Sequence, residues 1–314
     1  MPYKPKVYII ILNYLNWMDT IECMESVVNT YYKDKSIIVV NNGADAQSYI
    51  KIKDFAGRFP DADIHIINSE KNNGYAAGNN AGIRYAMSKG DAKYLWIINN
   101  DTVVMPDSID MLVEYCEEMS ARGRKLGITA SKIYYYGTDK IINGVGGRYN
   151  KMFGDGKLIG VFQKDKGQYD NCNVKLDYVP GSAMFVSAKF INETGLLNEE
   201  YFLFYEEMDW SLRGKKMGFE LGYCCKSVVF HKEGATIGSS SSGGKNSELA
   251  EFYGLRNRIF FTKKYFPLFL PFVCLGFIGV LINRLMRKQP GRIKNVLKAF
   301  GAGILYNGNS RTHK

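Results

Sequence analysis

The segment YFLFYEEMDWSLRGKKMG carries three carboxylates, Glu206, Glu207 and Asp209, within four residues. Carboxylates this close repel one another and are costly to bury, so a chain keeps them where they accept protons, bind a cation or hold a polar substrate. A simpler explanation is the start of a helix, where acids favour the positive dipole end, but this accounts better for one or two acids than for three. Arg213, four residues after Asp209, would pair with it along that helix.

A fourth carboxylate, Asp101, follows the apolar run 94–98 and the pair Asn99-Asn100. Open α/β sheets bind their ligands just beyond the carboxyl ends of buried strands. Together with the acidic cluster, this second site indicates an enzyme with two substrates. His231 ends another strand-like run, where it could serve a ligand, although a lone histidine there is more often an ordinary polar residue.

Alternating strand and helix patterns would position these residues. Continuous apolar runs, typical of strands buried on both faces, predict four strands at residues 7–12, 36–40, 64–67 and 94–98. Helical spacing of apolar residues follows the first and third of them, and Asp107 predicts the start of a further helix. This order predicts an α/β fold with a doubly wound, mostly parallel sheet.

Polar residues end each of these strands. They are Asn13, Asn41, Asn42, Asn72 and Asp101. Asparagine and glycine also make ordinary turns, and a single such turn would need no other explanation. Four polar turns at successive strand ends favour a binding cleft along one edge of the sheet.

The second half of the chain has weaker patterns. Residues 131–177, rich in glycine, tyrosine and charge, predict short strands and loops, and residues 221–230 predict another strand. The glycine- and serine-rich loop 238–245 is either a lid over the site or a plain loop.

The six cysteines are scattered without a CxxC pair, and the N-terminal residues run directly into a strand without a charged-then-apolar signal. We therefore expect reduced thiols and a cytosolic protein. The adjacent Cys224 and Cys225 are expected to be core and edge residues of a strand.

The net charge of +10 is concentrated in the tail. Residues 251–314 contain 12 Lys or Arg and one acidic residue, whereas the rest of the chain contains 29 basic and 30 acidic residues. The tail also holds the most apolar run, 266–282, with cations on both sides. This combination fits an anionic membrane surface better than nucleic acid.

The apolar run has 17 residues, the lower limit for a helix that spans a bilayer. Pro267 and Pro271 are expected to shorten its helical part, and a second amphipathic stretch covers residues 293–305. We therefore expect an anchor that lies in the membrane plane or re-enters it. The alternatives are a spanning helix, or helices that pack on the catalytic domain or on a partner subunit.

Eight segments occur in the order found in one enzyme family: ILNYLNW, VVNNGA, NNGYAAGNNAGIRYA, WIINNDTVVMP, GSAMFVS, GLLNEEYFLFYEEMDWSLRGKKMG, FHKEGAT and YGLRNRIFFTKKYFP. Over residues 7–267 the chain resembles the inverting glycosyltransferases of family 2, of GT-A fold, particularly the rhamnosyltransferase-like branch that builds bacterial surface polysaccharide. Each segment alone is a weak signal, but eight in the right order are specific. The chain has no Walker GxxxxGK[ST] or HExxH pattern, and no GxGxxG follows its first strand.

The resemblance implies a nucleotide-sugar donor site. Asn99-Asn100-Asp101 matches the family's Asp-X-Asp element, in which Asp101 would hold Mg²⁺ or Mn²⁺ on the donor diphosphate. His231 would be a second metal ligand or a diphosphate contact. The other residues implied to contact the donor are Asn13, Asn41 and Asn42 around the nucleobase and ribose, and Asn72, Gly74, Gly78 and Asn80 in a glycine-rich loop.

The resemblance also implies the catalytic base. Glu206-Glu207 matches the family's Glu-Asp motif, so Glu207 would deprotonate the acceptor hydroxyl, with Asp209 the rival and Glu206 an orienting group. The residues expected to bind the acceptor are Trp210, Gly181 and Ser182. Trp210 would otherwise be an ordinary core residue.

Three positions depart from the family pattern. Asn41 replaces the usual Asp after the second strand, Asn-Asn-Asp replaces Asp-X-Asp, and Glu207 replaces a shorter Asp. These changes bear on the nucleobase preference, the metal affinity and the position of the base. They also leave a non-catalytic relative as an alternative.

The sequence therefore predicts a GT-A catalytic domain over residues 1–250, with a nucleotide-sugar half (1–105) and an acceptor half (106–250), and a membrane-associating helical tail over 251–314. It would transfer a sugar, with L-rhamnose the first candidate, from a dTDP- or UDP-sugar to a growing lipid-linked glycan at the inner face of the cell membrane. A sister transferase using UDP-glucose or UDP-galactose, a nucleotidyltransferase and a nucleotide-binding scaffold are the alternatives. An oligomer is compatible with the sequence, and nucleic acid is not an expected partner.

Overall fold

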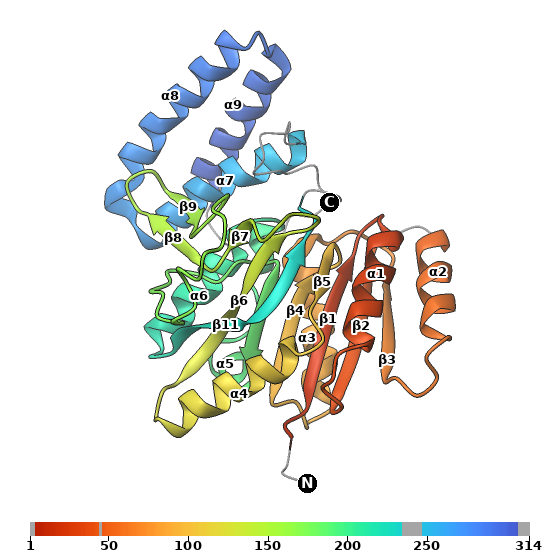
Figure 1. Cartoon of the computed structure of the whole chain (residues 1–314). Helices are drawn as coiled ribbons and strands as arrows, with labels where there is room; N and C mark the ends of the chain where they lie inside the picture. Colours follow the sequence, from red (N-terminus) through yellow and green to blue (C-terminus); the bar gives the residue numbers. More distant parts are fainter. Residues whose placement is uncertain (1–3, 44–45, 234–246, 307–314) are drawn as a thin grey trace.

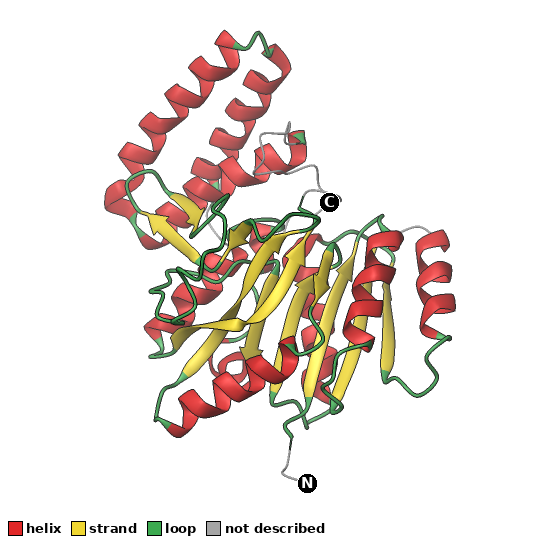
Figure 2. Ribbon diagram, viewed as in Figure 1, coloured by secondary structure: helices red, strands yellow, loops and turns green. Residues whose placement is uncertain are grey.

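The computed structural model describes residues 4–43, 46–233 and 247–306 of the 314-residue chain. A twisted sheet with helices on both faces forms the body, and two long helices project from one end of it (Figure 1). Figure 2 shows the helices lying in front of and behind the sheet. The loop 238–245, predicted as a lid or a plain loop, lies outside the described residues.

The described elements account for most of the chain. The strands are β1 (Val7–Asn13), β2 (Lys35–Asn42), β3 (Ile64–Ser69), β4 (Tyr94–Asn99), β5 (Thr102–Val104), β6 (Leu126–Tyr135), β7 (Ile142–Gly144), β8 (Gly147–Asn150), β9 (Asp155–Leu158), β10 (Ala183–Ser187) and β11 (Glu220–His231). The helices are α1 (Trp17–Val28), α2 (Ala46–Ala56), α3 (Gly74–Ser88), α4 (Ser108–Ala121), α5 (Ala188–Thr194), α6 (Glu206–Lys216), α7 (Glu248–Tyr265), α8 (Leu270–Met286) and α9 (Pro290–Leu305). The four strands predicted in the N-terminal half are confirmed.

The central sheet is mixed, with the strand order β3-β2-β1-β4-β10-β6-β11-β5 and β7 beside β6. Strands β3, β2, β1 and β4 pair in parallel, as do β6 and β11. Strand β10 runs antiparallel to both β4 and β6, and β5 runs antiparallel to β11. The predicted doubly wound sheet is therefore parallel over its N-terminal half, but the insertion of β10 makes the whole sheet mixed.

Successive residues of β1 enter two different cores, which explains its continuous apolar run. Ile9 and Ile11 pack with α1, α2 and α4 on one face. Ile10 and Leu12 pack with α3, α5 and α6 on the other face. Both faces of the sheet are covered, so the strand ends at its carboxyl edge are where polar side chains can meet a ligand.

The first helix of the tail packs on the body, so only the later part of the tail projects from it. Helix α7 begins at Glu248, three residues before the predicted start of the tail at residue 251, and packs on both the body and the α8–α9 hairpin. Ser247 caps it by accepting a hydrogen bond from the Ala250 amide at 3.1 Å. Ile259 of α7 is fully buried in an apolar cluster with Val273 of α8 and Val296 of α9.

As its prolines predict, the α-helical part of the apolar run 266–282 begins only at Leu270, but α8 continues beyond the run to Met286. Pro267 begins a short 3₁₀ turn and Pro271 lies in the first helical turn of α8, where a missing amide proton costs no hydrogen bond. The stretch Pro267–Met286 has 20 residues. Its most apolar 18-residue segment has a mean hydropathy of 2.0, and only 11% of that segment is buried. By length and composition it could cross a membrane. The second predicted helix is confirmed as α9.

The prediction of reduced thiols is wrong for two of the six cysteines. Cys172 and Cys225 form a disulfide, with Cα atoms 5.2 Å apart. They are 53 residues apart in the chain, and the loop before β10 brings Cys172 against β11, a contact that cysteine spacing alone does not encode. Cys224, predicted as a core residue, is a buried free thiol.

Candidate active site

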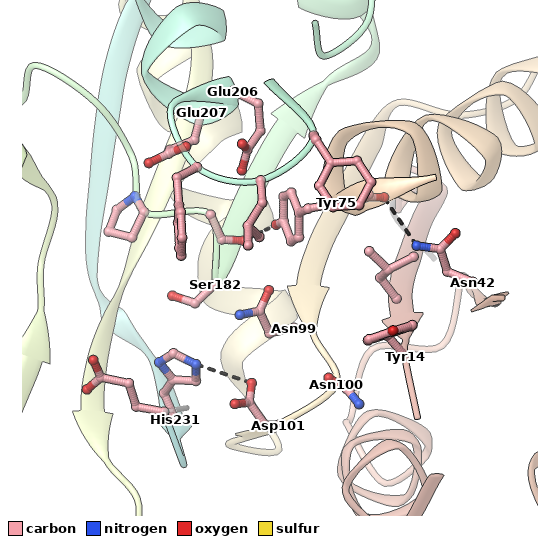
Figure 3. A pocket seen from close by; sticks show the side chains of 18 of the residues that line it. Tyr14, Asn42, Tyr75, Asn99, Asn100, Asp101, Ser182, Glu206, Glu207 and His231 are labelled. Atoms are coloured by element: carbon pink, nitrogen blue, oxygen red, sulfur yellow. Dashed lines mark hydrogen bonds and ion pairs between the residues drawn. The ribbon is translucent and has the colours of Figure 1, made fainter. Parts of the chain in front are cut away.

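A cleft of about 500 Å³ lies at the carboxyl edge of the sheet. It is enclosed by the ends of β1, β2, β4 and β11, the start of α3, and the loop that leads into α6. Its polar lining consists of Tyr14, Asn42, Asn72, Tyr75, Asn99, Asn100, Asp101, Asn143, Tyr178, Ser182, Glu206, Glu207, His231, Glu233 and Ser247. In Figure 3 the two glutamates lie on one side of this cleft, and Asp101 and His231 lie on the opposite side.

Asn42 holds the glycine-rich turn against the sheet. Its Nδ2 donates to Asn72 Oδ1 at 3.1 Å and to the Gly74 carbonyl at 3.2 Å, and its Oδ1 accepts from the Asn73 amide at 3.2 Å. Gly74 has a φ of +84°, and a Cβ there would lie 2.5 Å from the Phe202 carbonyl oxygen. Only glycine fits, so α3 can begin in contact with the loop before α6.

Asn13 and Asn41, contrary to the prediction, do not line the cleft. Both are fully buried, and Asn13 Nδ2 donates to Asn41 Oδ1 at 2.7 Å. Asn41 Nδ2 donates in turn to Asn68 Oδ1 at 2.8 Å, and Asn13 Oδ1 accepts from Thr20 at 2.7 Å. The amides satisfy one another because they follow neighbouring strands in register, and they fasten the ends of β1, β2 and β3.

Gly78 and Asn80 also lie away from the cleft. A Cβ on Gly78 would meet Leu12 Cδ1 at 2.5 Å, so this glycine lets α3 pack closely on β1 rather than exposing backbone to a ligand. Asn80 is fully buried and exchanges hydrogen bonds with Leu197, donating to its carbonyl at 2.9 Å and accepting from its amide at 3.1 Å. Its role is to hold the segment that precedes α6.

Asp101 and His231 meet at the turn between β4 and β5. The turn is held by Asn100, whose Nδ2 donates to the Asn16 carbonyl at 3.2 Å. Asp101 Oδ1 lies 3.2 Å from His231 Nε2, yet this buried oxygen accepts no well-aligned hydrogen bond within the described residues. His231 Nδ1 lies 3.4 Å from Asn143 Oδ1.

This pair fits a divalent cation in donor type, since it offers a carboxylate oxygen with spare capacity beside an imidazole nitrogen. Within the described ranges no group of three or more His, Cys, Asp or Glu side chains could hold a metal ion. A cation between Asp101 and His231 would therefore have two ligands of these types, and a bound substrate or water could supply others.

Glu206 and Glu207 begin α6, with one buried oxygen of each accepting no hydrogen bond in the described parts of the chain. Burial, followed by the neighbouring Glu207 charge, raises the pKa of Glu206 well above its ordinary value. Burial also raises the pKa of Glu207, to about 7. A carboxyl group with a pKa near neutrality is suited to take a proton in catalysis.

Asp209, the predicted rival base, points away from the cleft and is fully buried. It accepts from Arg213 Nε at 2.7 Å, Lys264 Nζ at 2.8 Å and the Tyr265 hydroxyl at 2.6 Å. Burial alone would raise its pKa, but Arg213 and the Lys264 hydrogen bond outweigh burial and hold the pKa below its usual value. Asp209 is thus a fully engaged structural anion.

Trp210, predicted to stack on a sugar or to lie in the core, is a core residue. Its ring is fully buried against Phe190 in an edge-to-face pair with centroids 5.2 Å apart, and its Nε1 donates to the Gly195 carbonyl at 2.9 Å. Gly181 and Ser182 do line the cleft. The Gly181 carbonyl accepts a hydrogen bond from the Tyr75 hydroxyl, and that of Ser182 accepts from the Asn99 amide at 3.1 Å.

An apolar wall beside the glutamates escaped the sequence analysis. It consists of Leu158, Tyr178, Pro180, Phe202, Leu203, Phe204 and Leu249. These residues come from loops and from the ends of short elements, where no periodic pattern marks them. Tyr75 was also missed, although its place inside the glycine-rich segment NNGYAAG was a usable signal.

Comparisons with known proteins agree with this geometry. Residues 8–163 match the family model described as Glycosyl transferase family 2. The low-salt glycan biosynthesis hexosyltransferase Agl10 of Haloferax volcanii is 26% identical over 232 residues, which cover 72% of this chain and 66% of that protein. The dTDP-rhamnosyl transferase RfbF of Shigella flexneri is 23% identical over 270 residues, 83% of this chain and 82% of that protein. The chain thus spans slightly less than two thirds of the first relative's length.

Two solved structures share the fold. The mannosyltransferase PcManGT from Pyrobaculum calidifontis, in complex with GDP-Man and Mn²⁺, has a TM-score of 0.58 at 12% identity and covers 96% of this chain and 76% of its own. The structure of GalNAc-T7 with UDP, GalNAc and Mn²⁺ has a TM-score of 0.61 at 13% identity. The match covers 84% of this chain and 49% of the GalNAc-T7 chain. The architecture is the GT-A-like α/β fold, and residues 8–163 within it are similar to glycosyltransferase family 2.

Proposed function

We propose that the chain is an inverting glycosyltransferase that moves a sugar from a nucleoside-diphosphate donor to an acceptor hydroxyl, with Glu207 as the base. The observation that carries this proposal is the pairing of two sites across one cleft. A buried carboxyl with a raised pKa stands on one side, and the Asp101–His231 pair stands on the other. A base and a diphosphate site must face the same anomeric carbon from opposite sides if the displacement is to be in line.

The chemistry then follows from these positions. Glu207 takes the proton of the acceptor hydroxyl while that oxygen forms its bond to the anomeric carbon, and the bond from that carbon to the diphosphate breaks. Asp101 and His231 would hold Mn²⁺ or Mg²⁺, which would neutralise the charge that develops on the leaving diphosphate. Asn42 and Asn72 would face the nucleotide from the sheet edge.

A dTDP-sugar, with dTDP-L-rhamnose first, is our leading donor, because one relative is a dTDP-rhamnosyl transferase. The other curated relative is a hexosyltransferase, which favours a UDP-hexose such as UDP-glucose or UDP-galactose as the second candidate. A nucleotide-binding scaffold without turnover remains the non-enzymatic alternative.

The acceptor we propose is a lipid-linked glycan, met at the inner face of the cell membrane. Helix α8 leaves large apolar side chains exposed, including Phe272, Leu275 and Ile278, and α9 adds Leu297. Cations of the same hairpin, such as Lys298, would contact anionic headgroups. The small buried share of Pro267–Met286 disfavours the alternative in which α8 merely packs on the body.

A donor panel tests the activity. We would measure hydrolysis of dTDP-L-rhamnose, UDP-glucose, UDP-galactose and GDP-mannose, each with Mn²⁺, Mg²⁺ or EDTA, on the wild type and on Glu207→Gln. The proposal expects metal-dependent hydrolysis of one donor that Glu207→Gln abolishes. Glu193→Gln, a surface carboxylate paired with Lys125, is the matched control and should behave as wild type. Binding of a nucleotide sugar without turnover would leave only the scaffold, and no binding of any of these donors would overturn the glycosyltransferase proposal.

Vesicle flotation tests the membrane proposal separately. The chain should float with vesicles that contain anionic lipid and less with neutral ones. Leu275→Glu with Ile278→Glu should abolish flotation without unfolding the protein, because both side chains are exposed. If the double variant instead converts an oligomer to a monomer and flotation never occurs, the exposed face is an interface between copies of the chain.

A further inference from the structure

The loop that carries the glutamate pair has an unusual backbone. Phe202, Phe204 and Tyr205, immediately before Glu206, have φ angles of 61°, 66° and 73°. Residues with a side chain rarely adopt this left-handed conformation, and it persists only where the surroundings hold it. The position of both glutamates therefore depends on what the rest of the protein provides to this loop.

Helix α7 provides the hydrogen bonds. Asn257 Nδ2 lies within 2.8 to 2.9 Å of three loop carbonyl oxygens, those of Tyr201, Leu203 and Phe204. Arg256 Nη2 donates to the Glu200 carbonyl at 2.5 Å, and Arg256 Nε donates to Asn257 Oδ1 at 2.8 Å. Asn257 is fully buried and Arg256 is buried, so these contacts do not compete with water.

The same helix also holds the segments on either side of the glutamates. Beyond them, Lys264 and Tyr265 bind the buried carboxylate of Asp209 on α6. Before them, the Phe202 ring stacks on Tyr253, with centroids 4.6 Å apart. The loop and the first turn of α6 are therefore attached to α7 at several independent points.

We propose that Asn257 and Arg256 are positioning residues that fix Glu207 at the place where it meets the acceptor hydroxyl; this inference rests on the function proposed above. Neither side chain lines the cleft, so neither touches the reacting groups. They act through the carbonyl groups of the loop. Neither side chain hydrogen-bonds to the strand ends that carry Asp101 and His231.

The test is a split between turnover and donor binding. Asn257→Asp keeps the shape but replaces the donating amide by an acceptor that faces three carbonyl oxygens. With whichever of the four donors the wild type hydrolyses in Mn²⁺, kcat should fall about 100-fold, as expected for a base displaced by about 1 Å. The KM for the donor should stay within about threefold. Arg256→Lys, which keeps the charge but loses the planar fork, should lose about tenfold in kcat.

Ile259→Ala is the matched control on the same helix. Ile259 is fully buried against α8 and α9 and does not contact the loop hydrogen bonds, so its loss should lower Tm while kcat stays within twofold. A wild-type kcat in both Asn257→Asp and Arg256→Lys would overturn the proposal. The proposal would also be overturned if the kcat of Ile259→Ala fell in step with its Tm, because a loss of stability alone would then lower turnover.

Amide hydrogen exchange over residues 201–207 provides a readout without activity. Asn257→Asp should accelerate exchange there and leave β1 and β4 unchanged. If the wild type turns over no donor, the proposed function fails, and this measurement still decides whether α7 holds the loop. Unchanged exchange in a folded Asn257→Asp variant would overturn the positioning role.

Discussion

The two sides of the cleft are built on different principles. Asn42 and Asp101 follow parallel strands, so the regular sheet delivers them to one edge. Glu206 and Glu207 instead follow a loop in left-handed conformations, which a helix 50 residues later in the chain holds in place. The proposed diphosphate side thus rests mainly on strand ends, whereas the proposed base depends on support from a distant segment.

Removal of the base should have the largest effect. Glu207→Gln keeps the size of the side chain but cannot accept a proton, so kcat should fall by about 10²- to 10⁴-fold. The donor dissociation constant, measured by calorimetry with Mn²⁺ present, should change little. A loss of donor binding instead of turnover would show that the two sides of the cleft do not act separately.

A substitution on the donor side should lower kcat/KM and weaken the metal-dependent binding of the nucleotide. Asp101→Asn removes the charge that faces His231 and should lower kcat/KM roughly 100-fold, because stabilisation of the leaving diphosphate weakens. The thermal shift produced by the nucleotide with Mn²⁺ should shrink to the value seen in EDTA. If the metal-dependent shift persists in this variant, Asp101 and His231 do not hold the cation.

Acidity should inactivate the proposed base. With a pKa of about 7, Glu207 is protonated progressively as the pH falls below neutrality, so kcat should drop up to tenfold per pH unit there. A folded-state pKa above the unfolded value means that the folded chain binds more protons between about pH 4.5 and 7. The contribution of Glu207 to stability should therefore fall as the pH rises through that window. Glu207→Gln should weaken the pH dependence of stability in urea unfolding and leave the part that comes from Glu206.

The smallest catalytic effect is expected at Trp210. Trp210→Phe removes the hydrogen bond to the Gly195 carbonyl and leaves a small gap, so the free energy of unfolding should fall by about 2 kcal/mol. Because the ring is buried away from the cleft, kcat should stay within twofold. A larger loss of kcat than of stability would return Trp210 to the acceptor site.

The sequence predicted what is local or periodic. Apolar runs located the parallel strands, and polar residues at their ends located the cleft. The acidic cluster located the side of the cleft that carries Glu206 and Glu207. Within that cluster the roles of Asp209 and Trp210 depend on which face of α6 is buried, and this is decided by α5 and α7. Asn257 and Tyr201 are 56 residues apart, as Cys172 and Cys225 are 53 apart, and no short-range pattern encodes such contacts.

The contact between the start of α3 and the loop before α6 has a consequence for recombination. Gly74 tolerates no side chain beside the Phe202 carbonyl, and the Tyr75 amide donates to that same oxygen at 2.6 Å. A chimera that takes residues 199–207 from a relative would therefore receive a loop shaped for a different neighbour. The exchange should yield an active protein only when residues 72–75 and 253–265 are taken from the same relative. These three segments, although separate in the chain, should therefore be exchanged as one unit.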